Sequence, residues 1–131
     1  MTRPASTPHR QRPVFLNLAK IKLPVGATTS IFHRVSGVLL AVSVPLVLFV
    51  LGRSIDSEAG FAQMADLLRQ PWAKLLIVAL VWSLAHHMLA GVRHMLTDVN
   101  IGSTLATARR SAWGVNLAAL AIAAFAIGVV L

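Results

Sequence analysis

Three long apolar runs, separated by short polar stretches, set the pattern of this chain. They cover residues 35–52, 72–89 and 112–131, and each approaches the ~20 residues that an α-helix needs to cross a bilayer. The helices are expected to extend past the apolar runs, over about residues 30–52, 71–97 and 112–131. The predicted fold class is therefore an all-α integral membrane protein with three transmembrane helices.

The stretches outside these runs complete the predicted organisation. Residues 1–29 are expected to form a cytoplasmic N-terminal arm with an interfacial segment, and residues 30–131 the three-helix anchor domain. Between the first two runs, residues 53–70 carry apolar side chains at helical spacing. We expect a short amphipathic helix there on the outer face, capped by Asp56 or Ser57.

Two local features predict how the long helices begin and pack. The threonine and serine cluster at residues 28–30 can cap a helix that begins close to Ser30. The third run contains many alanines together with Gly114 and Gly128, and small residues suit close packing of membrane helices. We therefore interpret the third helix as scaffold.

The charged residues are distributed unevenly along the chain, and this predicts its orientation. The formal net charge is +8, and basic residues gather before the first run and between the second and third. The connection between the first two runs mixes basic and acidic residues instead. By the positive-inside rule, the N-terminus is cytoplasmic and the C-terminus lies outside. No basic surface interleaved with aromatic residues is evident, so we expect no nucleic-acid partner.

The composition excludes several kinds of site. The chain has no cysteine, which excludes disulfides and iron–sulfur ligation by its own residues. It is 56% hydrophobic and only 12% charged, which is typical of a membrane protein rather than a soluble domain. We expect no separate soluble catalytic domain and no secretory signal, so that the first helix acts as the insertion signal.

Residues 83–98, which continue the second apolar run as the expected inner half of its helix, include five ionisable residues. These need a reason because titratable groups are costly in a bilayer. They are His86, His87, Arg93, His94 and Asp98. His87, His94 and Asp98 share one helix face with Gly91. A glycine one turn from a histidine leaves room for a flat ligand close to the backbone.

The first helix is predicted to open with a second polar cluster, formed by Ser30, His33 and Arg34. The first two helices are expected to be antiparallel. This cluster and the ionisable residues of the second helix should therefore converge at the cytoplasmic side. Haem needs an axial imidazole, apolar walls and cations for its two propionates, and the two clusters together offer all three.

Other chemistries could also use these polar clusters. Zinc is disfavoured because facing carboxylates and thiolates are missing. A proton path or small transporter could use His87, His94 and Asp98 as a relay. A purely structural anchor would use the histidines only for hydrogen bonds between helices. If haem is present, His86 and His87 cannot both bind one iron, since they project about 100° apart on their helix.

The chain also carries motifs of a known family. In chain order they are Arg12-Pro13, Ser30-x-x-His33-Arg34-x-Ser36-Gly37 and His87-x-x-x-Gly91-x-Arg93-His94-x-x-x-Asp98. Residues from about 12 to 111, including the loop 57–61, resemble the cytochrome b subunit of bacterial succinate dehydrogenase. That subunit is the larger of the two hydrophobic anchors of respiratory complex II. The third run agrees with the family only in being apolar.

The resemblance implies roles for individual residues. His87 matches the axial ligand of haem b, with His86 as second choice, and the opposite ligand comes from the small anchor subunit. Ser30 and Arg34 match positions that line the ubiquinone site. The haem propionate side is expected to involve the basic residues His33, Arg34, Arg93 and His94. Asp98 is expected to pair with Arg93 or with a residue of a partner.

The resemblance also implies a function and its partners. The chain is expected to be a multi-pass protein of the bacterial inner membrane, assembled with the small anchor, iron–sulfur and flavoprotein subunits. It would hold neither flavin nor succinate, and would help to pass electrons from succinate to ubiquinone. A fumarate reductase anchor, which works with quinol in the opposite direction, is the nearest alternative.

Overall fold

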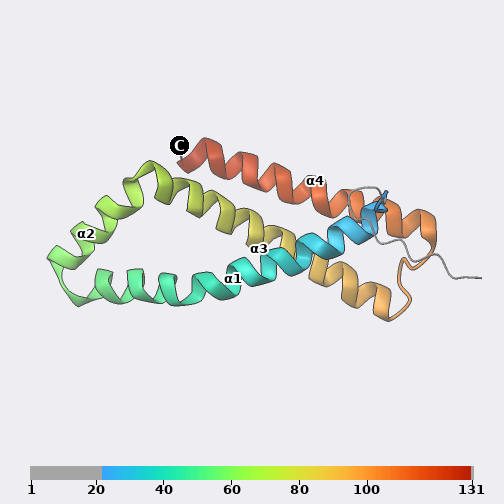
Figure 1. The fold of residues 1–131 in the computed structure, drawn as a ribbon, viewed down its shortest axis with the longest axis horizontal. Helices are drawn as coiled ribbons and strands as arrows, with labels where there is room; N and C mark the ends of the chain where they lie inside the picture. The colour runs from blue at the N-terminus through green and yellow to red at the C-terminus, as the bar shows by residue number, and fades with distance from the viewer. Residues whose placement is uncertain (1–21, 131) are drawn as a thin grey trace, which may run out of the picture.

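The computed structural model describes residues 22–130, which fold into four α-helices (Figure 1). Their bounds are α1 (Val25–Asp56), α2 (Glu58–Arg69), α3 (Pro71–Asp98) and α4 (Leu105–Val130). No strand occurs in this part of the chain. Helices α1, α3 and α4 are long and apolar enough to cross a membrane. The predicted all-α fold class with three candidate membrane helices is confirmed.

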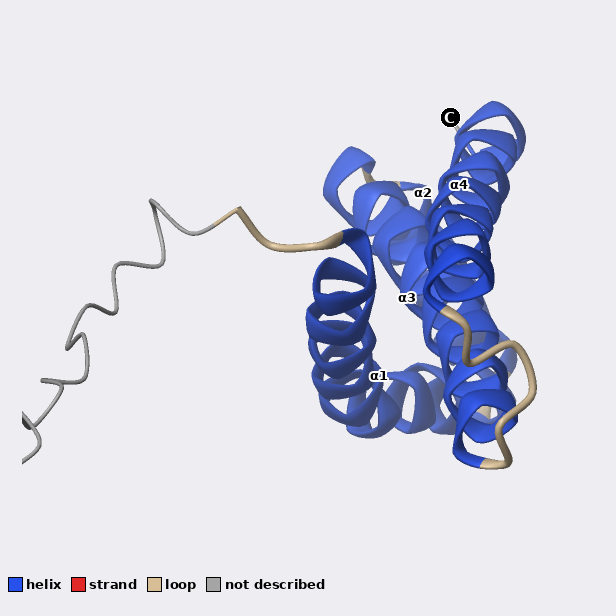
Figure 2. Cartoon of the chain, turned by 90° about the vertical axis from the view of Figure 1, so that its right-hand side faces the viewer, coloured by secondary structure: helices blue, strands red, loops and turns tan. Residues whose placement is uncertain are grey.

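The three long helices lie alongside one another and alternate in direction (Figures 1 and 2). The first turns of α1, the last turns of α3 and the start of α4 lie at one end of the molecule. The short helix α2 joins α1 to α3 at the opposite end, where α4 also finishes. Helix α3 packs against both α1 and α4. This arrangement brings the opening of α1 beside the polar half of α3.

The long helices pack through small residues spaced seven apart. The buried positions are Thr29, Ser36 and Ser43 on α1 and Ala112, Ala119 and Ala126 on α4. A seven-residue step returns to nearly the same helix face after two turns, and small side chains let helix backbones approach closely. Every buried hydrophobic residue of the described part is an alanine, while large apolar side chains point outward. Such a surface suits lipid and partner helices.

Helix α1 begins earlier than the sequence suggested. Its first residue is Val25, with Pro24 in an extended conformation at the N-cap and no side-chain cap. Thr29 lies a full turn inside the helix and is completely buried. The predicted cap near Ser30 is therefore wrong, because Pro24 sets the helix start and the threonine belongs to the packing surface.

The two other local predictions have opposite outcomes. The Ser57 hydroxyl accepts a hydrogen bond from the Gly60 backbone N–H at 3.0 Å and caps α2, as one of the two candidates. Gly114 and Gly128 do not serve the packing within the described chain, since a Cβ added at either would meet nothing within 4 Å. The alanines of α4 provide the close approach instead.

Candidate functional site

Three histidines from two helices meet where α1 and α3 pack together. The rings of His33 on α1 and His87 on α3 are stacked, with centroids 4.2 Å apart and planes within 10° of parallel. The ring of His94, two turns further along α3, lies 5.2 Å from that of His33. The predicted convergence of the two polar clusters therefore places these three side chains in direct contact.

His87 is held by the backbone of α1. Its Nδ1 lies 3.0 Å from the carbonyl oxygen of His33 and 3.4 Å from the Ser36 hydroxyl. A carbonyl oxygen only accepts hydrogen bonds, so this contact requires the proton on Nδ1. The Nε2 atom then carries the lone pair, and it has no hydrogen-bond partner among residues 22–130. A neutral imidazole with one nitrogen bonded to a carbonyl and the other free is the usual form of a metal-binding histidine.

Glycine makes room for this ring, but on the opposite helix from the one expected. A Cβ at Gly37 of α1 would lie 2.9 Å from Cε1 of His87, closer than such atoms normally approach. A Cβ at Gly91 of α3 would instead lie 3.4 Å from Nε2 of His33. Gly91 therefore lies against a histidine of α1 in this structure, and its predicted role beside a flat ligand stays a prediction.

Ser30 and Arg34 lie one turn apart on α1. Ser30 is half-buried and Arg34 is exposed. Neither side chain makes a hydrogen bond or ion pair within the described part of the chain. The exposed guanidinium of Arg34 is thus available to a ligand or a partner.

Arg93 is engaged in holding α3 to the start of α4. Its Nε donates to the Ser111 hydroxyl at 3.1 Å and its Nη2 to the Ala108 carbonyl at 3.2 Å. Asp98 is exposed, and the described residues give it no ion pair with Arg93. The structure thus supplies a packing role for Arg93, and the expected pairing of Asp98 with Arg93 does not occur in this chain.

His86 points away from His87 and toward α4. Its side chain is only 1% exposed, and its Nε2 lies 3.1 Å from Oδ1 of Asn116. The rings of Phe32 and Trp82 lie 5.8 and 5.4 Å from its ring. With one nitrogen engaged and the ring enclosed, His86 is the poorer candidate for iron. Sequence reasoning missed Asn116, although a polar amide within an apolar helix is a signal in itself.

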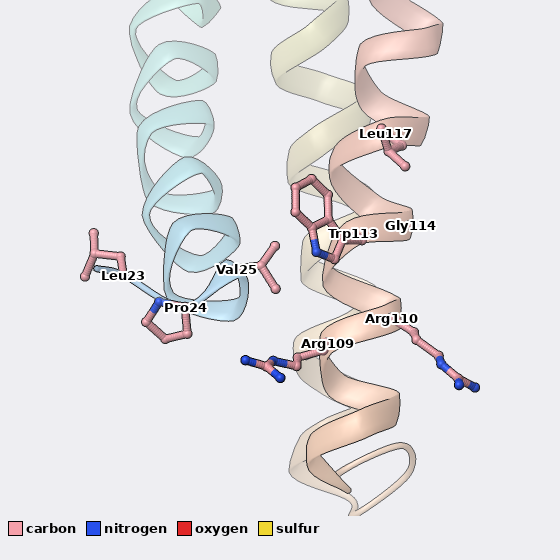
Figure 3. Close-up of a pocket in the computed structure, with 8 residues that line it drawn as sticks. All are labelled: Leu23, Pro24, Val25, Arg109, Arg110, Trp113, Gly114 and Leu117. Carbon is pink, nitrogen blue, oxygen red and sulfur yellow. The ribbon is translucent and has the colours of Figure 1, made fainter. Parts of the chain in front are cut away.

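The hollows of the surface lie apart from the histidines. A groove of about 670 Å³ runs between the start of α1 and the first turns of α4 (Figure 3). Its lining residues are Leu23, Pro24, Val25, Arg109, Arg110, Trp113, Gly114 and Leu117. None of the predicted site residues is among them. Residues 22–130 also contain no group of three or more side chains arranged to hold a bare metal ion. This absence does not concern haem, whose iron takes at most two protein ligands.

Comparison with known proteins adds independent evidence. The model of the succinate dehydrogenase/fumarate reductase transmembrane subunit family matches residues 8–128. A succinate dehydrogenase cytochrome b556 subunit of Coxiella burnetii is 34% identical over 106 residues, which cover 80% of this chain and 85% of the relative. The subunit of the same name from Paracoccus denitrificans is 33% identical over 101 residues, covering 76% and 77%. The chain therefore belongs to the family of succinate dehydrogenase/fumarate reductase transmembrane subunits.

Proposed function

We propose that this chain is the large membrane anchor of a succinate:ubiquinone oxidoreductase, in which His87 binds haem b and Ser30 and Arg34 bind the quinone. The observation that carries the proposal is the hydrogen bond from His87 Nδ1 to the His33 carbonyl, at 3.0 Å. This bond fixes the tautomer and ring orientation that an axial ligand needs. The two relatives are named cytochrome b556 subunits, which supports the same role.

The second axial ligand is expected from the small anchor subunit. His33 cannot supply it, because its ring is stacked on that of His87 rather than facing it across an iron. His86 is bonded to Asn116 on the other side of α3. His33, Arg34 and His94 are candidates to bind the haem propionates, and Arg93, whose donors already bond to α4, is a weaker one. When bound, the haem would supply a site that takes up and releases single electrons.

The quinone-binding role of Ser30 and Arg34 follows from their position and chemistry. They lie within the first three turns of α1, at the end that the charge distribution assigns to the cytoplasm. The hydroxyl and the guanidinium would donate hydrogen bonds to a quinone carbonyl oxygen. Reduction of ubiquinone to ubiquinol places negative charge on that oxygen before protons arrive, and a fixed cation stabilises this charge.

The electrons would reach the quinone from partner subunits. Oxidation of succinate to fumarate releases two electrons and two protons, and reduction of ubiquinone consumes the same numbers. A flavoprotein and an iron–sulfur subunit on the cytoplasmic side would carry the electrons, since this chain has no cysteine. We place the complex in a bacterial inner membrane, where the outward apolar surface of α1, α3 and α4 contacts lipid and the small anchor.

The test is a reduced-minus-oxidised visible spectrum of the purified complex. We expect a b-type α-band in the wild type, its loss in His87→Leu and its retention in His86→Phe, which keeps an aromatic ring beside Phe32 and Trp82. An α-band that survives in His87→Leu would contradict the assignment of the ligand. Absence of a band in the wild type would contradict haem binding itself.

The direction of the reaction separates this proposal from the fumarate reductase alternative. The family model covers both kinds of enzyme, whereas both relatives described above are succinate dehydrogenase subunits. Rates of succinate-driven ubiquinone reduction and quinol-driven fumarate reduction, measured on one preparation, decide between them. We expect the first rate to be the larger.

A further inference from the structure

Three polar side chains from three different helices meet in the apolar interior. Asn116 of α4 lies 3.1 Å from Nε2 of His86 on α3 and 3.2 Å from the hydroxyl of Thr29 on α1, in both cases through its Oδ1. Thr29 is completely buried and His86 almost so. Asn116 therefore connects all three long helices at one point.

His86 takes part in the hydrogen bonds of this cluster in either orientation of the Asn116 amide. If Oδ1 faces the two partners, it accepts from His86 Nε2–H and from the Thr29 hydroxyl. The Thr29 hydroxyl also lies 2.9 Å from the Val25 carbonyl and has a single hydrogen to give. If that hydrogen goes to Val25, the amide NH₂ turns toward the cluster and donates to both Thr29 and His86. Each arrangement uses Nε2 of His86.

The remaining nitrogen of His86 indicates that stability is not the reason for this residue. Its Nδ1 is buried and is the one buried side-chain nitrogen or oxygen within residues 22–130 that lacks a hydrogen-bond partner. An unpaired buried polar atom is destabilising. A phenylalanine would fill the space between Phe32 and Trp82 without it. The imidazole is therefore better explained by what its bond to Asn116 does.

The hydrogen bond between His86 and Asn116 also affects His87, the next residue on α3. We propose that Asn116 and Thr29, through His86, are positioning residues that fix the rotation of α3 about its axis and so aim His87 at the haem iron. This inference rests on the proposed function, because it concerns the ligand assigned there. His86 and His87 project about 100° apart, so holding one toward α4 turns the other toward α1.

A small rotation of α3 is enough to displace the His87 ring. Side-chain atoms lie roughly 5–6 Å from a helix axis, so a rotation of α3 by ~10° would move His87 by about 1 Å. A shift of that size breaks the 3.0 Å contact between its Nδ1 and the His33 carbonyl. The two bonds of Arg93 to α4 already tie these helices together further along. The cluster at Asn116 therefore serves to fix the orientation of α3 rather than to attach α3 to α4.

The experiment uses the assembled complex and measures the haem by its electron paramagnetic resonance signal and its rate of transfer to apomyoglobin. Asn116→Leu removes the amide at nearly constant volume, and Thr29→Val removes only the hydroxyl. Ser83→Ala is the matched control, since Ser83 is fully buried on α3 and its hydroxyl bonds only to the Ala79 carbonyl of the same helix. Thr29→Ser keeps the hydroxyl and is the rescue variant.

We expect Asn116→Leu and Thr29→Val to retain haem but to shift its resonance signal. Haem loss should be about fivefold faster in Asn116→Leu. Ser83→Ala and Thr29→Ser should match the wild type. Combining Asn116→Leu with Thr29→Val should add nothing to Asn116→Leu alone, because the hydroxyl acts through the amide.

The outcomes separate this inference from the proposed function. Haem signals in Asn116→Leu and Thr29→Val that equal those of Ser83→Ala would overturn the inference while leaving His87 as the ligand. A wild-type complex without haem, or one whose haem survives His87→Leu, would overturn the proposed function first. If Asn116→Leu fails to assemble, the comparison of Thr29→Val with Thr29→Ser decides the matter, because those variants change a single hydroxyl or methyl group.

Discussion

Gly37 offers a sharp test of the site, because the structure fixes how far a single methyl group would push His87. The Cβ of Gly37→Ala would lie 2.9 Å from Cε1 and 3.3 Å from Nδ1 of His87. Ordinary contact begins near 3.4 Å, so the ring must retreat by about 0.5 Å. It cannot retreat freely, since the ring of His33 is stacked on it with centroids 4.2 Å apart.

Two effects of opposite sign determine the stability of Gly37→Ala. Replacing a glycine by alanine within a helix gains roughly 0.5–1 kcal/mol. Overpacking a well-filled interior typically loses 1–3 kcal/mol. Retreat of the ring also stretches the 3.0 Å bond from His87 Nδ1 to the His33 carbonyl to the limit of a hydrogen bond. We expect a net destabilisation of about 1 kcal/mol and a larger effect on haem than on folding.

Gly52→Ala is the matched control. Gly52 lies on the same helix, and a Cβ added there meets nothing within 4 Å. We expect its thermal midpoint to be unchanged or higher and its haem content to equal that of the wild type. The assay is the ratio of haem to complex, together with the α-band and thermal denaturation. Full haem content and an unchanged band in Gly37→Ala would refute the claim that His87 is held against Gly37.

Two further predictions concern the arginines. Arg34→Leu should abolish most ubiquinone reduction while succinate oxidation with a soluble acceptor persists, because the proposed role of Arg34 is to donate hydrogen bonds to the quinone. Equal loss of both rates would contradict this role. Arg93→Leu should lower the thermal midpoint of the complex by removing two charged hydrogen bonds to α4, each worth about 1.5–3 kcal/mol. The α-band of Arg93→Leu should stay in place. The control Arg110→Leu, at an exposed position on α4, should change neither the thermal midpoint nor the α-band. A displaced α-band with an unchanged thermal midpoint in Arg93→Leu would instead support a role for Arg93 in binding a haem propionate.

The sequence predicted the helices well because their signal is local. An apolar run of sufficient length dictates a helix in a bilayer, whatever lies beside it. The packing surfaces were also present in the sequence, as small residues spaced seven apart on α1 and α4. Gly114 and Gly128 make no close contact within residues 22–130, because small size alone does not say which face of a helix meets a neighbour in the same chain.

The face of α3 could be predicted only in part. Helical periodicity correctly separates His86 from His87 by about 100°. It does not say which of the two faces α1 and which faces α4, because that depends on how the helices are ordered in space. Asn116 supplies the missing constraint. An amide in an apolar helix must find polar partners, and Asn116 finds His86 on α3 and Thr29 on α1.

The two adjacent histidines therefore acquire different chemistry from their neighbours rather than from their own position in the sequence. His86 meets an amide that can donate or accept, so its tautomer follows the orientation of Asn116. His87 meets a backbone carbonyl that only accepts, so its proton must sit on Nδ1 and its Nε2 is left with a lone pair. The carbonyl belongs to His33, within the opening motif of α1, and Gly37 in the same motif leaves the space for the ring. The motif on α1 thus gives His87 the tautomer that its proposed role as haem ligand requires.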